Sequence, residues 1–579
     1  MKRFRWLTAG TLIFAAAAAA SAQPAPTFNP ERLDQHIQEL SSDAYQGRAP
    51  ATAGEQMTVE YLSKQLQAAG VQPGGDLVNG RRQWTQRVPL LRSEFVGEPQ
   101  VTIQTAAGPI RLTQGEQVAV MPPVNGQKQV TLNGAPLVFA GYGVTAPERG
   151  WDDFKGQDVR GKILVVLVND PDFEGGEGDF GGKAMTYYGR WSYKNEEAAR
   201  RGAAGIIIVH ETEPASYGWN TVKNSFPAAN FDIVRQNPAS VHTAFESWIQ
   251  RDVAQQIFRA AGLDFEQAKQ AARRKDFRPI DLRARLDARM QVNSEVITSY
   301  NVAGMLPGTT RPDETVIYTA HHDHIGVGDP DENGDRIFNG AIDNATGAAH
   351  VLEQARAWAR APRADRSVVF LFVGAEEKGL LGSKYYVTNP LYPLSETVAV
   401  LNTDALGAWG PARDFSIAGT ARLELLDMLI AEAAKRGRSF TPDQRPEAGG
   451  FFRSDHFPFA QAGVPAVSFK SGNNLVNGGI ERGRALAADY NEKRYHQPDD
   501  EYNPDWDLSG IAADAALLFA VGYSLADSNA WPNWSADSEF RPERDKSGAE
   551  RGAAAAPAPA PPAQAPAAVP VEPAKGERG

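Results

Sequence analysis

The chain has 579 residues, of which 42% are hydrophobic and 22% charged, and its net charge is −11 at pH 7. This length and composition exclude a wholly disordered chain, a collagen-like rod and a coiled coil, and they predict two domains and a tail. The balance of 59 Lys and Arg against 70 Asp and Glu argues against nucleic acid as a partner, because phosphate neutralisation needs clustered cations. The chain has no cysteine, which excludes thiol catalysis and zinc sites built on cysteine.

The N-terminus reads as an export signal. Three basic residues within the first five precede an apolar run from Leu7 to Ala20, and the Ala-Ser-Ala sequence ending at Ala22 is a small-x-small cleavage site. The alternative, an uncleaved anchor helix, needs about 20 apolar residues. We therefore expect a Sec-type signal peptide over residues 1–22 and a periplasmic or secreted protein. No later stretch reads as long and apolar enough to cross a membrane, so no transmembrane segment is expected after cleavage.

The first half of the chain changes character twice. Residues 31–70 have apolar residues at helical spacing on either side of a Gly-Arg-Ala-Pro break, which predicts two helices around a loop. Short alternating strands then dominate residues 92–132. Two apolar strands at 162–168 and 204–209 flank a helix-like segment, as in a βαβ unit, and residues 243–275 read as helical and charged. We expect residues 96–292 to form a self-contained, β-rich domain.

The second half alternates strands and helices. Apolar strand patterns fall at 316–319, 368–373, 398–401 and 466–469, with helical patterns at 345–361 and 423–435 between them. This alternation predicts an α/β fold, with a mostly parallel-core sheet flanked by helices and ligand groups at the carboxyl ends of the strands. The last part, residues 535–579, is polar and then rich in Ala and Pro, and is expected to be a disordered tail.

Several polar residues follow those strands directly. His321 and Asp323 end the first strand and project to the same side of extended backbone, whereas the intervening His322 points the other way and is expected to fill space. The adjacent acids Glu376 and Glu377 follow the second strand. One of them could hold a metal while the other acts as a base, although the same two residues would also occur in an acidic turn exposed to solvent.

Three further residues complete the pattern. Asp343 stands at the entry to a helix, where capping alone would explain it. Asp404 ends the third strand, and His496 lies in a loop stiffened by Pro498. Each signal is weak by itself, but their joint order along the chain is specific.

In this order the chain resembles the M28 family of zinc aminopeptidases and glutamate carboxypeptidases, clan MH, over about 28–95 and 293–530. The resemblance rests on the motifs Gly47-Arg48-x-Pro50, Ala320–His324, Gly340–Gly347, Gly374–Ser383, Asn402–Asp404, Ser454–His456 and Tyr495–Pro498. Residues 96–292 look like the protease-associated (PA) domain often inserted in that family, on the segments Gly141–Gly143, Trp151–Phe154, Val159–Leu164 and Ala198–Ile207.

The resemblance implies two zinc ions per chain, with Mn²⁺ or Co²⁺ as possible substitutes. The implied ligands are His321 and Asp404 on one ion, Glu377 and His496 on the other, and Asp343 shared by both. A hydroxide held between two such ions would be the nucleophile.

The resemblance also implies roles for residues beside the metals. Glu376 would be the general base, Asp323 would fix the tautomer of His321, and His456 could contact substrate or a developing oxyanion. The substrates would be peptides with a free N-terminus. A carboxypeptidase or dipeptidase, a glutaminyl-cyclase-like enzyme and a non-catalytic binding protein remain alternatives. The expected organisation is 1–22 signal peptide, 23–95 and 293–534 peptidase domain, 96–292 PA-like domain and 535–579 tail.

Overall fold

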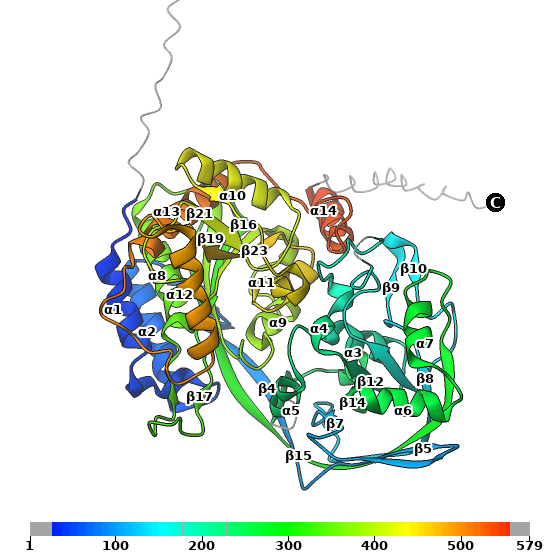
Figure 1. Ribbon diagram of the computed structural model, residues 1–579. Coiled ribbons are helices and arrows are strands. Elements are labelled where there is room, and N and C mark those ends of the chain that lie inside the picture. Colours follow the sequence, from blue (N-terminus) through cyan, green and yellow to red (C-terminus); the bar gives the residue numbers. More distant parts are fainter. Residues whose placement is uncertain (1–25, 176–177, 226–228, 556–579) are drawn as a thin grey trace, which may run out of the picture.

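The computed structural model describes residues 26–175, 178–225 and 229–555, which form two lobes side by side (Figure 1). The predicted signal peptide lies outside the described residues. A large lobe is built from residues 26–95 and 293–555, and an inserted lobe from residues 96–292. Each lobe has its own buried apolar clusters, which include Phe370 in the large lobe and Phe139 in the inserted one.

The large lobe is organised around a mixed sheet with a parallel centre. Strands β19 (Arg366–Val373), β16 (Arg311–His321), β20 (Thr397–Thr403) and β23 (Ala466–Ser471) are parallel neighbours in that order. On the outer sides, β15 (Ile280–Leu306) pairs antiparallel with β19, and β21 (Asp414–Ile417) antiparallel with β23. Continuous apolar runs are typical of strands buried on both faces, and every residue of β19 and β20 is buried. The predicted α/β fold with a parallel core is confirmed.

Helices cover both faces of this sheet (Figure 1). Successive residues of β19 point to opposite faces, so Phe370 belongs to one apolar cluster and Leu371 to another. The first cluster lies under α1 (Pro30–Leu40), α2 (Ala53–Ala69), α8 (Gly347–Arg360), α10 (Glu424–Lys435) and α13 (Ser509–Ala526). The second lies under α9 (Leu381–Thr388) and α11 (His456–Gln461). Of the other large-lobe helices, α12 (Gly479–Lys493) is mostly exposed, and the C-terminal helix is described below.

The two predicted N-terminal helices are present. Asn29 caps α1 by accepting the N–H of Glu31 at 2.7 Å, and the helix buries the periodic residues Leu33, Ile37 and Leu40. Helix α2 ends at Gly70, whose φ of 90° is a left-handed conformation that glycine adopts at little cost. The predicted break between the two helices contains Arg48, which is described below.

The inserted lobe contains both strands and helices. Its central strands β8 (Gln129–Phe139), β11 (Ile163–Leu167), β12 (Gly205–His210) and β14 (Phe245–Gln250) are parallel neighbours. Helix α3 (Trp191–Arg200) connects β11 to β12, which confirms the predicted βαβ unit. Helices α6 (Arg251–Ala260) and α7 (Phe265–Ala272) pack against the same core, while β5 (Gln100–Thr105), β6 (Gly108–Leu112) and β7 (Val118–Val120) add antiparallel strands.

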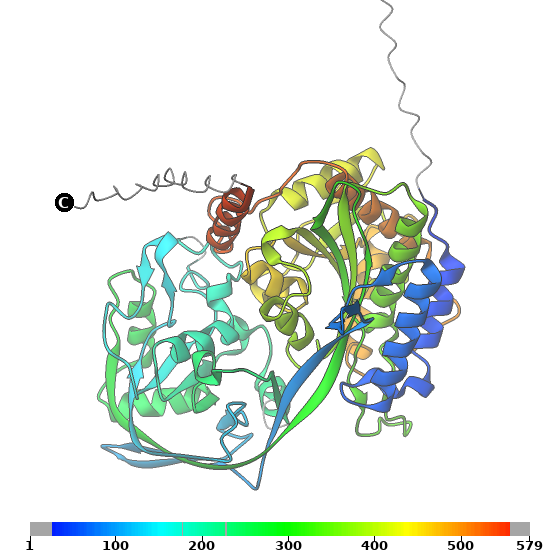
Figure 2. The same cartoon turned by 180° about the vertical axis from the view of Figure 1, so that it is seen from behind.

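A long two-stranded ribbon joins the lobes (Figure 2). Strand β15 runs through both lobes, and β4 (Thr85–Phe95) pairs antiparallel with its second half, from Val302↔Thr85 to Val292↔Phe95. The predicted domain boundaries near 95 and 292 fall at the inserted-lobe end of this pairing. Strand β13 (Asn230–Ile233) of the inserted lobe pairs with β4 and thickens the ribbon.

A second contact holds the inserted lobe beside α11. The Tyr187 ring packs 5.2 Å from Phe457 and 6.2 Å from Phe452, measured between ring centroids. Its hydroxyl accepts a hydrogen bond from Gln461 Nε2 at 2.7 Å, and the Met185 N–H donates to Pro446 O at 3.1 Å. The inserted lobe is therefore fixed next to the segment that carries Ser454–His456.

The boundary predicted for the disordered tail, residue 535, lies too early in the chain, because ordered structure continues beyond it. Residues 541–555 form α14 (Arg541–Ala555), and Phe540 is only 6% exposed. Arg544 is buried too and donates to Thr397 O at 2.9 Å and Val398 O at 3.0 Å. The sequence around them is polar, so the prediction missed one aromatic anchor and one arginine that satisfies carbonyls at the start of β20. Residues 556–579 lie outside the described residues.

We expect Phe540→Ala to destabilise the large lobe. The ring packs 5.0 Å from the ring of Trp534 and 5.8 Å from that of Phe451, and emptying such an aromatic site costs about 3–5 kcal/mol. Thermal unfolding should show a clearly lowered Tm, whereas Glu550→Ala on the exposed side of α14 should shift stability by no more than about 0.5 kcal/mol. Equal Tm values for the two variants would show that the C-terminal segment adds nothing to the fold.

One helix corrects the expectation that no later segment could span a membrane. By length and composition α13 qualifies, with a mean hydropathy of 1.5 over 18 residues, but 67% of that window is buried inside the protein. Leu517, Leu518 and Leu525 of this helix are fully buried in the large-lobe core. Its apolar character is explained by packing between α8 and the sheet.

Candidate metal centre

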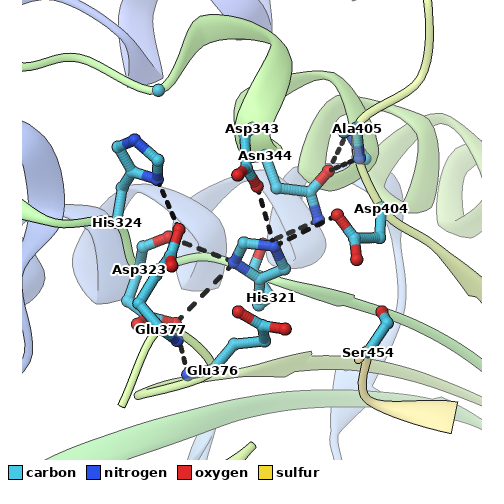
Figure 3. A network of polar contacts seen from close by, with 12 residues as sticks. His321, Asp323, His324, Asp343, Asn344, Glu376, Glu377, Asp404, Ala405 and Ser454 are labelled. Carbon is cyan, nitrogen blue, oxygen red and sulfur yellow. Dashed lines mark hydrogen bonds and ion pairs between the residues drawn. The ribbon is translucent and has the colours of Figure 1, made fainter. Parts of the chain in front are cut away.

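The predicted site residues meet at one edge of the large-lobe sheet. His321 is the last residue of β16, and Asp404 follows β20 directly. Because these strands are parallel neighbours, their carboxyl ends lie at the same edge. Glu376 and Glu377 follow β19, the neighbour on the other side of β16. Figure 3 shows the side chains of Asp343, Asp404, Glu376 and Glu377 gathered around His321.

Two loops bring the remaining candidates to this edge. Asp343 lies in the turn Ala341–Thr346 that leads into α8, and is 3% exposed. His496 lies in the loop after α12, which ends at Lys493. Neither position follows from strand alternation, yet both side chains reach the residues at the strand ends.

The two oxygens of Asp343 face two different groups. Its Oδ1 lies 3.2 Å from His321 Nε2, which is itself 3.5 Å from Asp404 Oδ1. Its Oδ2 lies 3.3 Å from His496 Nε2, which is 3.2 Å from Glu377 Oε2. The five residues therefore form two sets of donors that share one carboxylate.

His324 was missed by the sequence analysis. Its Nδ1 lies 2.7 Å from Glu377 Oε1, and its ring is fully buried, 5.8 Å from the ring of His496. His324, Asp343 and Glu377 offer ligand atoms within 4.8 Å of one another, as do His321, Asp343 and Asp404. The signal was present in the sequence, since His324 is the third histidine of the Ala320–His324 run.

This donor set fits zinc. Imidazole nitrogens and carboxylate oxygens, without sulfur, suit Zn²⁺ and also Mn²⁺ or Co²⁺. The carboxylates of Asp323, Asp343 and Glu377 are each less than 10% exposed and crowd one small volume. Such a group of like charges is unfavourable unless cations neutralise it. The side chain of His321 is 1% exposed and that of His496 37%, so the centre opens to solvent on the His496 side.

Asp323 holds the loop that carries the two glutamates. Its Oδ1 accepts the backbone N–H of Glu376 at 3.0 Å, and its Oδ2 accepts that of Glu377 at 3.3 Å. His321 Nδ1 lies 3.2 Å from the backbone oxygen of Asp323 and 3.9 Å from its Oδ1. The hydrogen-bond partner of His321 Nδ1 is therefore the backbone oxygen of Asp323, while the Asp323 carboxylate, predicted to fix the tautomer of His321, binds the glutamate loop.

Glu376 differs from its neighbour Glu377. Burial, together with the nearby charges of Glu377 and Asp455, raises the pKa of Glu376 well above its ordinary value. For Glu377, His496 and His324 outweigh the effect of burial and lower the pKa. No hydrogen bond to the Glu376 carboxylate occurs within residues 26–175, 178–225 and 229–555. Two adjacent carboxylates with opposite proton affinities are typical of a base beside a ligand.

The buried acid Asp500 holds the Asp343 turn through backbone hydrogen bonds. Asp500 Oδ1 accepts the N–H of Ile342 at 2.9 Å, and its Oδ2 accepts that of Asp343 at 3.0 Å. Asn344 Nδ2 donates to Thr403 O at 3.1 Å, beside Asp404. These bonds fix the shared carboxylate relative to β20. Asp500 belongs to the Tyr-His-x-Pro segment but received no role from the sequence.

Two histidines do not join the centre. His322 Nε2 donates to Tyr300 O at 2.8 Å on the side away from His321, in agreement with the space-filling role predicted for it. His456 is fully buried against the Phe451 ring, 4.6 Å away, and burial lowers its pKa to about 3. Because solvent does not reach His456, the structure gives no support to the predicted contact with substrate.

Tyr495 lies against His496 and was also missed. Its ring stacks on that of His496 with centroids 3.9 Å apart, and the residue is 43% exposed. Packing of the ring and the charges of Asp343 and Glu377 raise the pKa of its phenol well above the ordinary value. The phenol of Tyr495 therefore keeps its proton at neutral pH.

Comparison with known proteins places this site in a family. Residues 301–520 match the model of peptidase family M28. This part of the chain belongs to peptidase family M28. The matched range contains the residues at the strand ends and the Asp343 turn, and His496 and Tyr495 lie near its C-terminal end.

Named relatives match this chain over limited segments. Leupeptin-inactivating enzyme 1 of Streptomyces exfoliatus is 32% identical over 180 residues, which is 30% of this chain and 36% of the relative. Aminopeptidase YwaD of Bacillus subtilis is 29% identical over 175 residues, 30% of this chain and 35% of the relative. The chain thus spans about a third of the length of these two curated relatives.

Among solved structures, the aminopeptidase from Aneurinibacillus sp. strain AM-1 aligns with 87% of this chain and 95% of its own. Its sequence identity is 19% and its TM-score 0.46. The zinc aminopeptidase BSAP from Bacillus subtilis aligns with 88% of this chain and 97% of its own, with 19% identity and a TM-score of 0.40.

Proposed function

We propose that this M28 chain is an exported two-zinc aminopeptidase that removes residues from the free N-termini of peptides. The observation that carries the proposal is the division of the Asp343 carboxylate between two donor sets, with Glu376 unpaired beside them. The name of the relative from Bacillus subtilis, an aminopeptidase, supports the choice of reaction. The basic and apolar segment at residues 1–22 supports export.

The proposed ligands would hold the metals in two groups. His321 and Asp404 would bind one zinc ion, Glu377 and His496 the other, and Asp343 both. Ions so held lower the pKa of bound water towards about 7 and polarise a carbonyl group. His324, 2.7 Å from Glu377 Oε1, would orient that ligand. Asp323 would orient His321 and the Glu376–Glu377 loop together.

The chain's own groups account for the proton transfers. Glu376, with its raised pKa, would take a proton from the attacking water and pass it to the leaving amine as the peptide C–N bond breaks. A carboxylate with a raised pKa accepts a proton from water more readily than an ordinary one, and in its protonated form it can then donate that proton to the amine. Tyr495, which keeps its phenol proton, would donate a hydrogen bond to the oxygen of the scissile carbonyl as negative charge develops there.

Tyr495→Phe tests this donation. We expect kcat to fall by about 100-fold, the range seen when one preorganised donor to an oxyanion is removed, with metal content unchanged. The matched control is Tyr502→Phe, whose hydroxyl donates to Asp34 at 2.9 Å, away from the centre. Steady-state kinetics on a dipeptide amide would give kcat for both variants. Wild-type kcat in the Tyr495 variant would remove the residue from the reaction.

The proposed reaction is tested by mass spectrometry of the purified mature protein. A peptide mixture with free and acetylated N-termini would be followed over time, with and without a chelator. We expect stepwise loss of residues from free N-termini only, abolished by the chelator. Trimming from the C-terminus, or pyroglutamate formation without cleavage, would reassign the chain to a carboxypeptidase or a glutaminyl-cyclase-like activity. Unchanged peptides would favour the binding-protein alternative.

A further inference from the structure

Arg48 is a buried cation outside the set of residues used above. It lies between α1 and α2, is 1% exposed, and has a φ of 53°, in the left-handed region that costs a side-chain-bearing residue about 1 kcal/mol or more. A residue persists in that conformation where its surroundings hold it there. Its guanidinium supplies those contacts.

All four hydrogen bonds of this guanidinium go to backbone carbonyls. Nη1 donates to Leu40 O at 2.7 Å and to Asn339 O at 2.6 Å. Nη2 donates to Gly340 O at 2.9 Å, and Nε donates to His322 O at 3.0 Å. One planar group thus joins the end of α1 to two separate loops, a geometry that suits the rigid fork of arginine.

Both loops lead directly to proposed metal ligands. His322 is adjacent to His321, and Gly340 stands three residues before Asp343. The Asp343 turn is held on one side by Asp500 through the N–H groups of residues 342 and 343. Arg48 holds its other side. The relative position of the two ligands therefore depends on a group that touches neither of them.

The charge of Arg48 also faces the centre. Burial lowers its pKa to about 10, while the carboxylates of Asp500, Asp323, Asp343 and Glu377 oppose that effect. Arg48 remains a cation at neutral pH, and no carboxylate of the described chain lies within salt-bridge distance of it. Its charge therefore attracts several carboxylates of the centre and is not paired with a single one of them.

We propose that Arg48 is a positioning residue that sets the metal affinity of the centre by fixing the backbone before Asp343 and after His321. This inference rests on the proposed two-metal site. Contacts one step removed from a metal typically change affinity or activity 10- to 100-fold. Methionine fills the volume of the arginine stem without donating, and lysine keeps the charge but cannot span four carbonyls.

Arg366 provides the matched control. It is also 1% exposed and donates to the carbonyls of Leu525 at 2.6 Å and Ala530 at 2.8 Å. It is the first residue of β19 and so lies at the end of the sheet opposite the centre. Loss of either arginine should lower stability, but only loss of Arg48 should affect the metal site.

The experiment measures zinc affinity of the full mature chain by competition with a chelator of known affinity, together with the Tm of each apo-protein. We expect Arg48→Met to bind zinc about 10- to 100-fold more weakly, Arg48→Lys to fall between it and wild type, and Arg366→Met to match wild type despite a lowered Tm. Equal zinc affinity in wild type and Arg48→Met would overturn the inference, as would equal weakening in Arg366→Met.

Two further outcomes are decided by the same data. If Arg48→Met does not fold, Arg48→Lys carries the test, and wild-type affinity in that variant would contradict the positioning role. Failure of wild type itself to bind zinc would refute the proposed metal site, a result distinct from any difference between variants.

Discussion

An enzyme in which Glu376 is replaced by glutamine is expected to bind its metals normally and to lose about 1,000-fold in kcat, within the range attributed to one general acid–base group. Glutamine keeps the size of the side chain but cannot accept a proton. Because no hydrogen bond of the described residues ties the Glu376 carboxylate to the fold, the substitution should leave the loop and its Asp323 contacts unchanged. Metal analysis, Tm and kcat on one peptide substrate check the three parts of this expectation.

The neighbouring substitution provides the contrast. Glu377→Gln changes a residue that lies 3.2 Å from His496 Nε2 and 2.7 Å from His324 Nδ1, so it should lose about one metal equivalent as well as activity. Near-normal kcat in Glu376→Gln would disprove the general-base role. If Glu376→Gln instead lost metal like Glu377→Gln, the two glutamates would have been assigned the wrong way round.

Asp343→Ala is expected to have the largest effect on metal content. This side chain gives one oxygen to each donor set, so its loss should weaken both metal positions and reduce activity by at least about 1,000-fold, since both ions act on the same reacting atoms. Asp404→Ala removes a residue from the His321 set only and should spare the other position. Metal per chain after dialysis, measured by elemental analysis, separates the two cases.

The metal content of Asp343→Ala decides whether the Asp343 carboxylate is shared by two metal ions. Two metal equivalents retained in Asp343→Ala would contradict a common carboxylate. One equivalent lost in Asp343→Ala, and the same one in Asp404→Ala, would show that Asp343 belongs to the His321 set alone. In that case His324 and His496 would have to complete the second set with Glu377.

Strand periodicity predicted the parts of the site that follow from sheet geometry. His321 and Asp404 end parallel neighbouring strands, and that rule alone places them at one edge. The positions of Asp343 and His496 came from the order of motifs, because the turn before α8 and the loop after α12 have no periodicity to read. The resemblance supplied what local patterns could not.

The residues that were missed act through long-range contacts. Asp500 and Arg48 bind backbone groups far away in the sequence, and no local pattern reports such a partner. His324 was inside a recognised run but lies beyond the strand, where alternation no longer fixes its direction. Tyr495 precedes a recognised histidine, and its role depends on ring stacking that only the folded loop creates.

The fold was predicted with similar strengths and gaps. A continuous apolar run such as 368–373 predicts a strand buried on both faces in an α/β chain, and β19 confirms this prediction. The charged segment 243–275 of the inserted lobe was predicted to be helical, and α6 and α7 lie within it and bury stripes that include Phe258 and Phe265. Residues 245–250 form strand β14 instead. The C-terminal segment read as tail because its anchors, Phe540 and Arg544, are isolated in a polar sequence.

The most direct test of the account is a zinc titration of metal-free wild-type protein, with activity on a peptide with a free N-terminus measured at each step. We expect activity to rise until two zinc ions per chain are bound and then to level off, with Asp343→Ala inactive throughout. Full activity at one ion per chain, or activity that does not depend on zinc or another divalent metal, would contradict the two-metal centre around Asp343.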